Sequence, residues 1–182
     1  IELAKMCETN KIDTELYTKN KVNRGLRDLN GKGVLTGLTE ISEIVSKKIV
    51  DGEEVSCDGE LYYRGIDVHK IADGITGAGR HNGFEEVTYL LLFGKLPSER
   101  ELLDFMIILA NYRDALPKNF VRDVIMKAPS NDIMNNLQRA VLTLYSYDHN
   151  ANDTTIPNVL RQSLELIAMF PMLAAYSYAA KI

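Results

Sequence analysis

The segment GELYYRGIDVHKIADG, residues 59–74, is the part of the sequence that most constrains the fold. Two tyrosines precede the pair Arg64-Gly65, and Asp67, a residue type that favours the position before a helix, follows. The segment therefore joins a part with short β-like stretches to a helical part. Its arginine can either bind a carboxylate ligand or bond to nearby backbone and acidic groups. The second role is favoured, because the planar fork of guanidinium donors is well suited to ordering the junction itself.

The chain is predicted to divide at this junction. Residues 1–66 form an irregular N-terminal segment with a small β-hairpin, in which glycines interrupt the helical periodicity. Residues 67–182 form a helical lobe. One helix is expected within residues 1–18.

The hairpin is predicted from its turn residues. Asp51-Gly52 is a strong signal for a tight turn between two strands, and a further β-like stretch lies around Asp58-Gly59. We expect a sheet of two or three strands. Because such a sheet is marginally stable alone, it must lie against something larger.

The first helices of the lobe have recognisable ends. Asp67 is expected to cap a short helix over 68–72 that stops at Gly74. A glycine-rich loop then leads into a helix over 84–93, which closes at Gly94.

The later helices are marked by a capping box and by prolines. Ser98 and Glu101 form the box, and the helix that follows reaches about Tyr112. Pro171 lies inside the last apolar stretch and is expected to kink that helix without ending it. The helices expected after Tyr112 cover 118–127, 131–145 and 157–181.

Composition and charge exclude several classes of partner. The net charge of -4 gives no basic footprint for nucleic acid. The longest apolar runs, such as VTYLLLF at 87–93, are too short to span a bilayer, so no membrane partner is expected. The cysteines Cys7 and Cys57 lie far apart and form no C-x-x-C pair. These features predict a cytoplasmic protein.

Several motifs imitate a known site and fail. GAGRHNG at 77–83 has its third glycine one residue too late for a dinucleotide loop. DHNAND at 148–153 lacks the turn glycine and the closing glutamate of a calcium loop. No zinc-binding spacing connects His69, His81 and His149. No metal site and no bound cofactor are therefore expected.

Five segments occur in a fixed order: GVLTGLTEIS at 33–42, GELYYRGIDVHKIA at 59–72, FEEVTYLLLFGKLPSERELLDF at 84–105, TLYSYD at 143–148 and VLRQSLELIAMFPMLAAYSY at 159–178. This series, with G-K-L-P after a helix and a proline inside the last helix, resembles the citrate synthases, including the related 2-methylcitrate synthases. The resemblance covers most of this chain and well under half of a family-length chain.

The resemblance implies a function. Citrate synthases join acetyl-CoA to oxaloacetate and release citrate and CoA, a carbon–carbon bond-forming acyl transfer of the tricarboxylic acid cycle. In the family an aspartate removes a proton from the thioester methyl group. One histidine stabilises the enol, and a second assists the ketone oxygen of oxaloacetate.

All three catalytic groups lie, in the family, beyond Ile182. No catalytic, cofactor-binding or metal role is therefore transferred to any residue of this chain. The chain begins at Ile1 and ends inside an apolar helix, which suggests the N-terminal portion of the enzyme, truncated before its catalytic part. We expect the chain alone to be inactive and to self-associate, with acetyl-CoA as cosubstrate of the parent enzyme only.

The resemblance also implies an architecture: a mainly α fold, the multi-helical large-domain portion of a citrate-synthase-like fold, with a small β element near the N-terminus. In the family, the helices that correspond to 131–146 and 157–181 lie at a two-fold dimer interface. Small and aromatic residues support this contact, because alanines allow helices to approach closely and tyrosines supply amphipathic contact area. The residues concerned are Ala174, Ala175, Ala179, Ala180, Tyr176 and Tyr178.

Two alternatives stay open. The extended loop GITGAGRHNG at 74–83 leaves the choice between acetyl-CoA and propionyl-CoA, the substrate of a 2-methylcitrate synthase, undecided. The second alternative is a non-catalytic helical dimerisation or interaction module that kept the interface helices and lost the chemistry.

Overall fold

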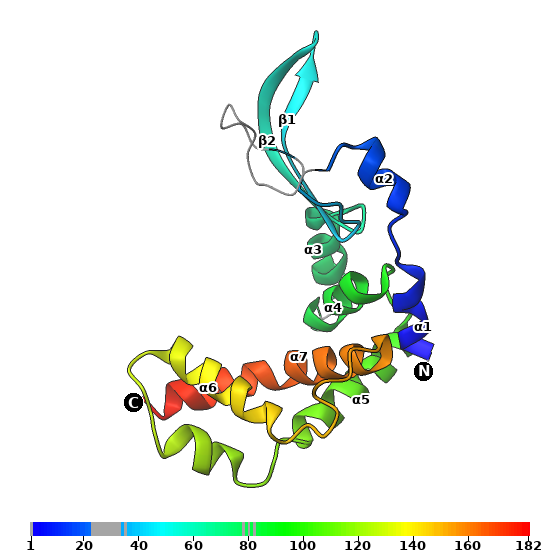
Figure 1. Ribbon diagram of the computed structural model, residues 1–182. Helices are drawn as coiled ribbons and strands as arrows, with labels where there is room; N and C mark the ends of the chain where they lie inside the picture. Colours follow the sequence, from blue (N-terminus) through cyan, green and yellow to red (C-terminus); the bar gives the residue numbers. More distant parts are fainter. Residues whose placement is uncertain (1, 23–33, 35, 78, 80, 82) are drawn as a thin grey trace. The chain divides into compact units, whose positions relative to one another are not determined.

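The computed structural model describes residues 2–22, 34, 36–77, 79, 81 and 83–182. It divides into two compact units, an N-terminal unit of residues 5–102 and a C-terminal unit of residues 1–4 and 103–182. Helices dominate and a single small sheet is described (Figure 1). The mainly α fold with a small β element is therefore confirmed. The proposed division of the chain at residue 66 stays a prediction.

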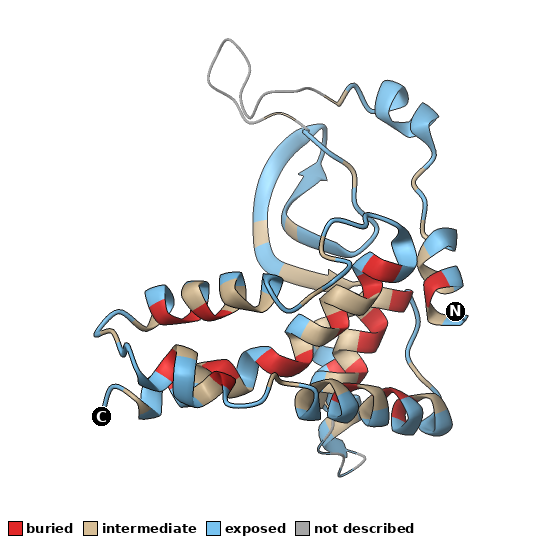
Figure 2. Ribbon diagram, turned by 60° about the horizontal axis from the view of Figure 1, so that its bottom comes forward, coloured by how far each residue is buried: buried red, intermediate tan, exposed pale blue. Residues whose placement is uncertain are grey.

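The sheet is antiparallel and its strands follow in the order β1, β2, β3. Asp51 and Gly52 connect the first two strands with φ angles of 53° and 86°. Two successive left-handed residues are the signature of a type I′ turn, which matches the twist of the strands. The hairpin predicted here is confirmed, and most of its length is exposed (Figure 2). The strands are β1 Ser42–Val50, β2 Glu53–Tyr63 and β3 Ile66–Asp67.

The stretch around Asp58-Gly59 lies within β2. The register between β1 and β2 shifts between Val45 and Lys47, opposite this dipeptide. Such a shift inserts unpaired residues and bends the strand. The two residues therefore form part of a bulge.

The predicted single helix over 1–18 is wrong. The structure has α1 Glu2–Thr9 and α2 Thr14–Lys19. Asp13 caps α2, since its side chain accepts a hydrogen bond from the backbone N–H of Glu15 at 3.0 Å. A new N-cap so soon after Thr9 favours a second helix over continuation of the first.

The helix that begins after Asp67 is longer than predicted. Its cap is as expected, because the Asp67 carboxylate accepts from the backbone N–H of His69 at 2.7 Å. The helix, α3 Val68–Gly77, continues through Gly74. A glycine in a helix interior costs only about 1 kcal/mol relative to alanine, so it does not end a helix by itself.

The next helix ends as predicted. Helix α4 Gly83–Phe93 is followed by Gly94 at a φ of 80°, and the N–H of Gly94 donates to the Leu90 carbonyl at 2.8 Å. A left-handed glycine in this position is a common helix terminator. The rings of Tyr89 and Phe93 meet edge-on at 4.6 Å, and both side chains are buried.

The predicted capping box is present at the start of α5 Glu99–Asp114, a helix that contributes to both units. The Glu101 carboxylate accepts from the backbone N–H and the hydroxyl of Ser98 at 2.8 and 2.9 Å. Lys95 donates to the same carboxylate at 2.7 Å. The hydrogen bonds from Lys95 and Ser98 together lower the pKa of Glu101 to about 2.

The C-terminal unit is built on two helices that pack together, α6 Ile133–Tyr145 and α7 Ile156–Ala179 (Figure 1). Helix α7 continues through Pro171, so the expectation that this proline does not end the helix is confirmed. A third element, η1 Val121–Met126, packs against both helices. The buried cluster that they share comprises Phe120, Ile125, Leu137, Ala140, Met169 and Leu173.

The helix predicted over 118–127 is only partly correct. Asn119 has a φ of 64°, which starts a new element after Pro117-Lys118. The element that follows, η1, is a π-helix and covers only residues 121–126.

Candidate functional site

Arg64, the residue singled out by the sequence, bonds to the backbone of a helix. Its Nε and one terminal nitrogen, Nη2, donate to the carbonyl oxygen of Leu91 at 3.2 and 2.8 Å. Leu91 lies in the last turn of α4, where carbonyls lack partners within the helix. A cation there also complements the helix dipole. Arg64 therefore orders the junction through bonds to nearby backbone, the role that the sequence favoured.

The backbone of the arginine is as constrained as its side chain. Arg64 and Gly65 have φ angles of 50° and 78°, and Tyr63 pairs with Ile66 across them. The pair therefore forms a second tight turn of the I′ kind, between β2 and β3. This turn aims the guanidinium at α4.

Helix α1 covers the same end of α4. The Cys7 thiol lies 4.0 Å from the Leu92 carbonyl, and the Tyr89 hydroxyl lies 4.0 Å from the Met6 sulfur. Burial raises the pKa of the Cys7 thiol, and the charge of Arg64 opposes that rise. A thiol with a raised pKa is a poor nucleophile, and its contact with α4 suits Cys7 to packing.

The three histidines lie on or beside three different helices. His69 lies on α3, His81 precedes α4 and His149 follows α6, and all three are exposed. A catalytic histidine needs a partner that orients it or sets its pKa. His69 and His81 belong to the N-terminal unit and His149 belongs to the C-terminal unit.

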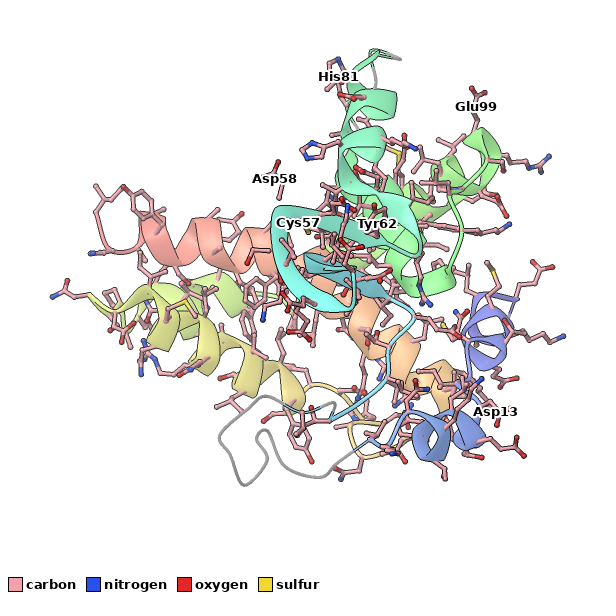
Figure 3. The ribbon with its side chains drawn as sticks, turned by 90° about the horizontal axis from the view of Figure 1, so that it is seen from above. Asp13, Cys57, Asp58, Tyr62, His81 and Glu99 are labelled. Carbon is pink, nitrogen blue, oxygen red and sulfur yellow. The ribbon has the colours of Figure 1, made fainter. Side chains whose placement is uncertain are left out.

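Three exposed acidic residues of the N-terminal unit and His81 lie apart from one another. Figure 3 shows Asp13, Asp58, His81 and Glu99 in different parts of this unit, with none directed at another. Among the residues that the structure describes, no group of three or more His, Cys, Asp and Glu side chains is arranged to hold a metal ion.

A cleft with a volume of about 560 Å³ lies in the C-terminal unit, between α6 and α7. The lining residues that belong to α6 are largely apolar. Those that belong to α7 and to the connection between the helices include polar side chains. A cleft of this kind is a typical binding feature. Its lining residues are Val141, Leu142, Leu144, Tyr145, Asp148, Ala151, Gln162, Glu165 and Leu166.

The polar end of the cleft is a closed network around Asp148. Its carboxylate accepts from Arg161 at 2.6 Å, from Gln162 at 2.9 Å and from the backbone N–H of Asn150 at 3.0 Å. The hydrogen bonds from Gln162 and Arg161 lower the pKa of Asp148 from 3.8 to about 2. Arg161 also donates to Glu165 at 3.0 Å.

This network explains why the calcium-loop resemblance at 148–153 fails in the structure as well as in the sequence. The carboxylate that would start the loop is bonded to an arginine and a glutamine of α7. This role of Asp148 was not predicted, because no local pattern in the sequence connects it to Arg161. The arrangement can hold the connection against α7 and present an apolar cleft, but it offers no poised acid, base or nucleophile.

Comparison with known proteins gives a consistent result. A family model described as "Citrate synthase, C-terminal domain" matches residues 26–182. The chain is 29% identical over 180 residues to "Citrate synthase 1, peroxisomal" from Arabidopsis thaliana, covering 93% of this chain and 34% of that protein. The crystal structure of citrate synthase from Pyrobaculum aerophilum is similar with a TM-score of 0.62 and 26% identity, covering 86% of this chain and 38% of that one.

A second solved structure shares the fold. It is the ternary complex of carboxymethyl coenzyme A and oxaloacetate with citrate synthase from Thermoplasma acidophilum, with a TM-score of 0.61 and 21% identity. It covers 88% of this chain and 36% of that one. The chain belongs to the citrate synthase family, because the family match covers most of its length. It spans about a third of the length of the relatives that it matches, 34% of the protein from Arabidopsis.

The bond between Arg64 and α4 can be tested by substitution. Arg64→Gln shortens the side chain's reach and removes its charge, so we expect the free energy of unfolding to fall by about 1–3 kcal/mol. Urea unfolding followed by circular dichroism measures this change. Arg100→Gln, on the exposed part of α5, is the matched control and is expected to stay within about 0.5 kcal/mol of the parent. Equal effects of the two substitutions would contradict the role assigned to Arg64.

The Asp148 network predicts an acid-sensitive contribution to stability. Because the folded-state pKa of Asp148 lies below its ordinary value, the contribution is present above about pH 4 and is lost as the pH falls toward 2. We expect Asp148→Asn to lower the urea midpoint at pH 7 and to flatten its fall between these pH values. Asp104→Asn, an exposed position on α5, is the control. A parallel pH profile for Asp148→Asn and the parent would disprove the assignment.

Proposed function

We propose that this chain is the N-terminal portion of a citrate synthase, whose complete form condenses acetyl-CoA with oxaloacetate to give citrate and CoA. The observation that carries the proposal is the family match over residues 26–182. The Thermoplasma relative whose fold it shares was solved with a coenzyme A derivative and oxaloacetate, which supports the same substrates here. The reaction is an acyl transfer that forms a carbon–carbon bond.

We further propose that the chain alone is inactive. Carbon-acid chemistry needs a base within hydrogen-bond reach of the substrate methyl group and donors aimed at the developing enolate. The three histidines are exposed on separate elements. The carboxylate at the polar end of the cleft, Asp148, is bonded to Arg161 and Gln162 and keeps a low pKa, which suits a structural role. By resemblance, the catalytic groups lie in the rest of the enzyme.

The role that we propose for this chain is assembly, through a homodimer that uses α6 and α7. Support comes from the exposed apolar residues on both helices, because contiguous exposed apolar surface often marks a protein–protein contact. Leu142 is 73% exposed, and it lies beside the apolar cleft. The other exposed apolar residues of these helices are Met134, Tyr145, Ile156, Val159, Leu166, Phe170, Tyr176 and Tyr178.

The exposed apolar surface of α6 and α7 is also compatible with a second candidate function. A non-catalytic helical dimerisation module would need the same two helices and none of the chemistry. A 2-methylcitrate synthase, with propionyl-CoA in place of acetyl-CoA, differs from a citrate synthase in the acyl pocket.

We propose a cytoplasmic location. The thiols of Cys7 and Cys57 are both free, as a reducing compartment favours. The relative from Arabidopsis is named peroxisomal, so the compartment differs within the family. Within the described part of the chain, no helix combines the length and the apolar character that a membrane crossing requires.

The activity is tested by release of free thiol. Acetyl-CoA and propionyl-CoA are each offered with and without oxaloacetate to the full-length gene product and to this chain. We expect oxaloacetate-dependent release by the full-length protein with acetyl-CoA, and none by this chain. Preference for propionyl-CoA would make the parent a 2-methylcitrate synthase. No release by the full-length protein from either thioester would leave the dimerisation module as the function.

The dimer is tested by placing a charge on the proposed contact. We expect Leu142→Glu to weaken self-association at least 30-fold, about 2 kcal/mol, because burying an unpaired carboxylate in an apolar contact is costly. Sedimentation equilibrium measures the dissociation constant. Leu103→Glu is the matched control, since this leucine is 57% exposed on α5, outside the proposed contact. Equal association of the two variants would place the interface elsewhere.

A further inference from the structure

The element η1 has a hydrogen-bonding register that is rare in proteins. A π-helix bonds each N–H to the carbonyl five residues earlier, whereas an α-helix bonds it to the carbonyl four residues earlier. The six residues of η1, Val121–Met126, form such a helix ahead of α6, and at its start the Asp123 N–H donates to the Asn119 carbonyl, four residues earlier, at 2.9 Å. Short π-helices often occur at functional positions. The resemblance to the family gives no account of this one.

The burial pattern explains the register. Phe120 and Ile125 are 1% and 3% exposed, and both belong to the cluster shared with α6 and α7. They are five residues apart. In an α-helix that separation turns the second side chain about 140° away from the first, at about 100° per residue. In a π-helix the fifth residue returns to the same side, so the π register allows both residues to enter one core.

The neighbouring residue offers an alternative. Val124 lies four residues after Phe120 and is half-buried against the same cluster. An α-helix over this segment would keep Phe120 and Val124 on the core side and turn Ile125 toward solvent. A change from the π to the α register therefore replaces Ile125 in the core by Val124, which is one methylene smaller. The α register also makes the more common type of backbone hydrogen bond.

We propose that residues 121–126 are a conformational switch between two helical registers. The segment is a π-helix while the Ile125 side chain packs in the core against α6 and α7. It is an α-helix when the core no longer has space for that side chain. The switch then changes the path of the connection into α6, whose N-cap is Asp132. The proposal concerns the fold of this chain and does not depend on its proposed function.

The anchoring of the segment limits where the change takes place. Upstream, the ring of Phe120 meets that of Tyr147 edge-on at 5.9 Å, and its N–H donates to the Pro117 carbonyl at 2.9 Å. Both contacts are compatible with either register. The Asp123 N–H already bonds to the carbonyl four residues earlier, so the change is expected among the N–H groups that follow Asp123.

The test exchanges the two competing side chains. The double variant V124I/I125V keeps the composition and places the larger side chain where the α register buries it. Through-hydrogen-bond NMR couplings identify the acceptor of the Met126 N–H. We expect the Val121 carbonyl, five residues earlier, in the parent chain, and mainly the Arg122 carbonyl in the variant. Two methylenes change sides, so the ratio of registers is expected to shift about tenfold.

Two further variants complete the design. Met126→Leu, at a position that is 58% exposed in the same element, is the matched control and should keep the parent's acceptor. The single variant V124I changes only a half-buried position and replaces the double variant in the test if the latter does not fold. It is expected to raise the fraction of molecules in which residues 121–126 adopt the α register. An acceptor four residues earlier in the parent chain overturns the proposal. The parent's acceptor pattern in every folded variant overturns it as well.

Discussion

The guanidinium of Arg64 makes the contact on which the N-terminal unit depends. It binds the carbonyl of Leu91 with two nitrogens and so fastens the end of β2 to the end of α4. The bond requires a backbone turn that aims the side chain, and Gly65 makes the second half of that turn sterically easy. A small sheet is marginally stable alone. Its attachment to a helix explains how a largely exposed hairpin persists in this fold.

The C-terminal unit is organised differently, by a core and a network at opposite ends of one helix. The first turns of α7 carry Arg161 and Gln162, which hold Asp148 in the preceding connection. The later turns carry Met169 and Leu173, which are fully buried in the cluster shared with α6 and η1. One end of α7 is therefore fixed by charge and the other by apolar packing.

These two arrangements suit a scaffold. In both, the polar groups that looked most suited to chemistry are satisfied within the chain, and satisfied groups order a structure without being available to a substrate. The exposed apolar residues of α6 and α7 have the opposite character, because their contacts are incomplete. This contrast supports the proposal that the chain contributes assembly surface to a citrate synthase while the rest of the enzyme contributes the chemistry.

The sequence alone determined the features that depend on neighbouring residues: the hairpin turn at Asp51-Gly52, the capping box of Ser98 and the helix that ends at Gly94. Each follows from local backbone chemistry. Tertiary structure decided what depends on distant partners. Arg64 finds its acceptor 27 residues away, and the register of η1 depends on a core made with α6 and α7, which no local pattern in the sequence reveals.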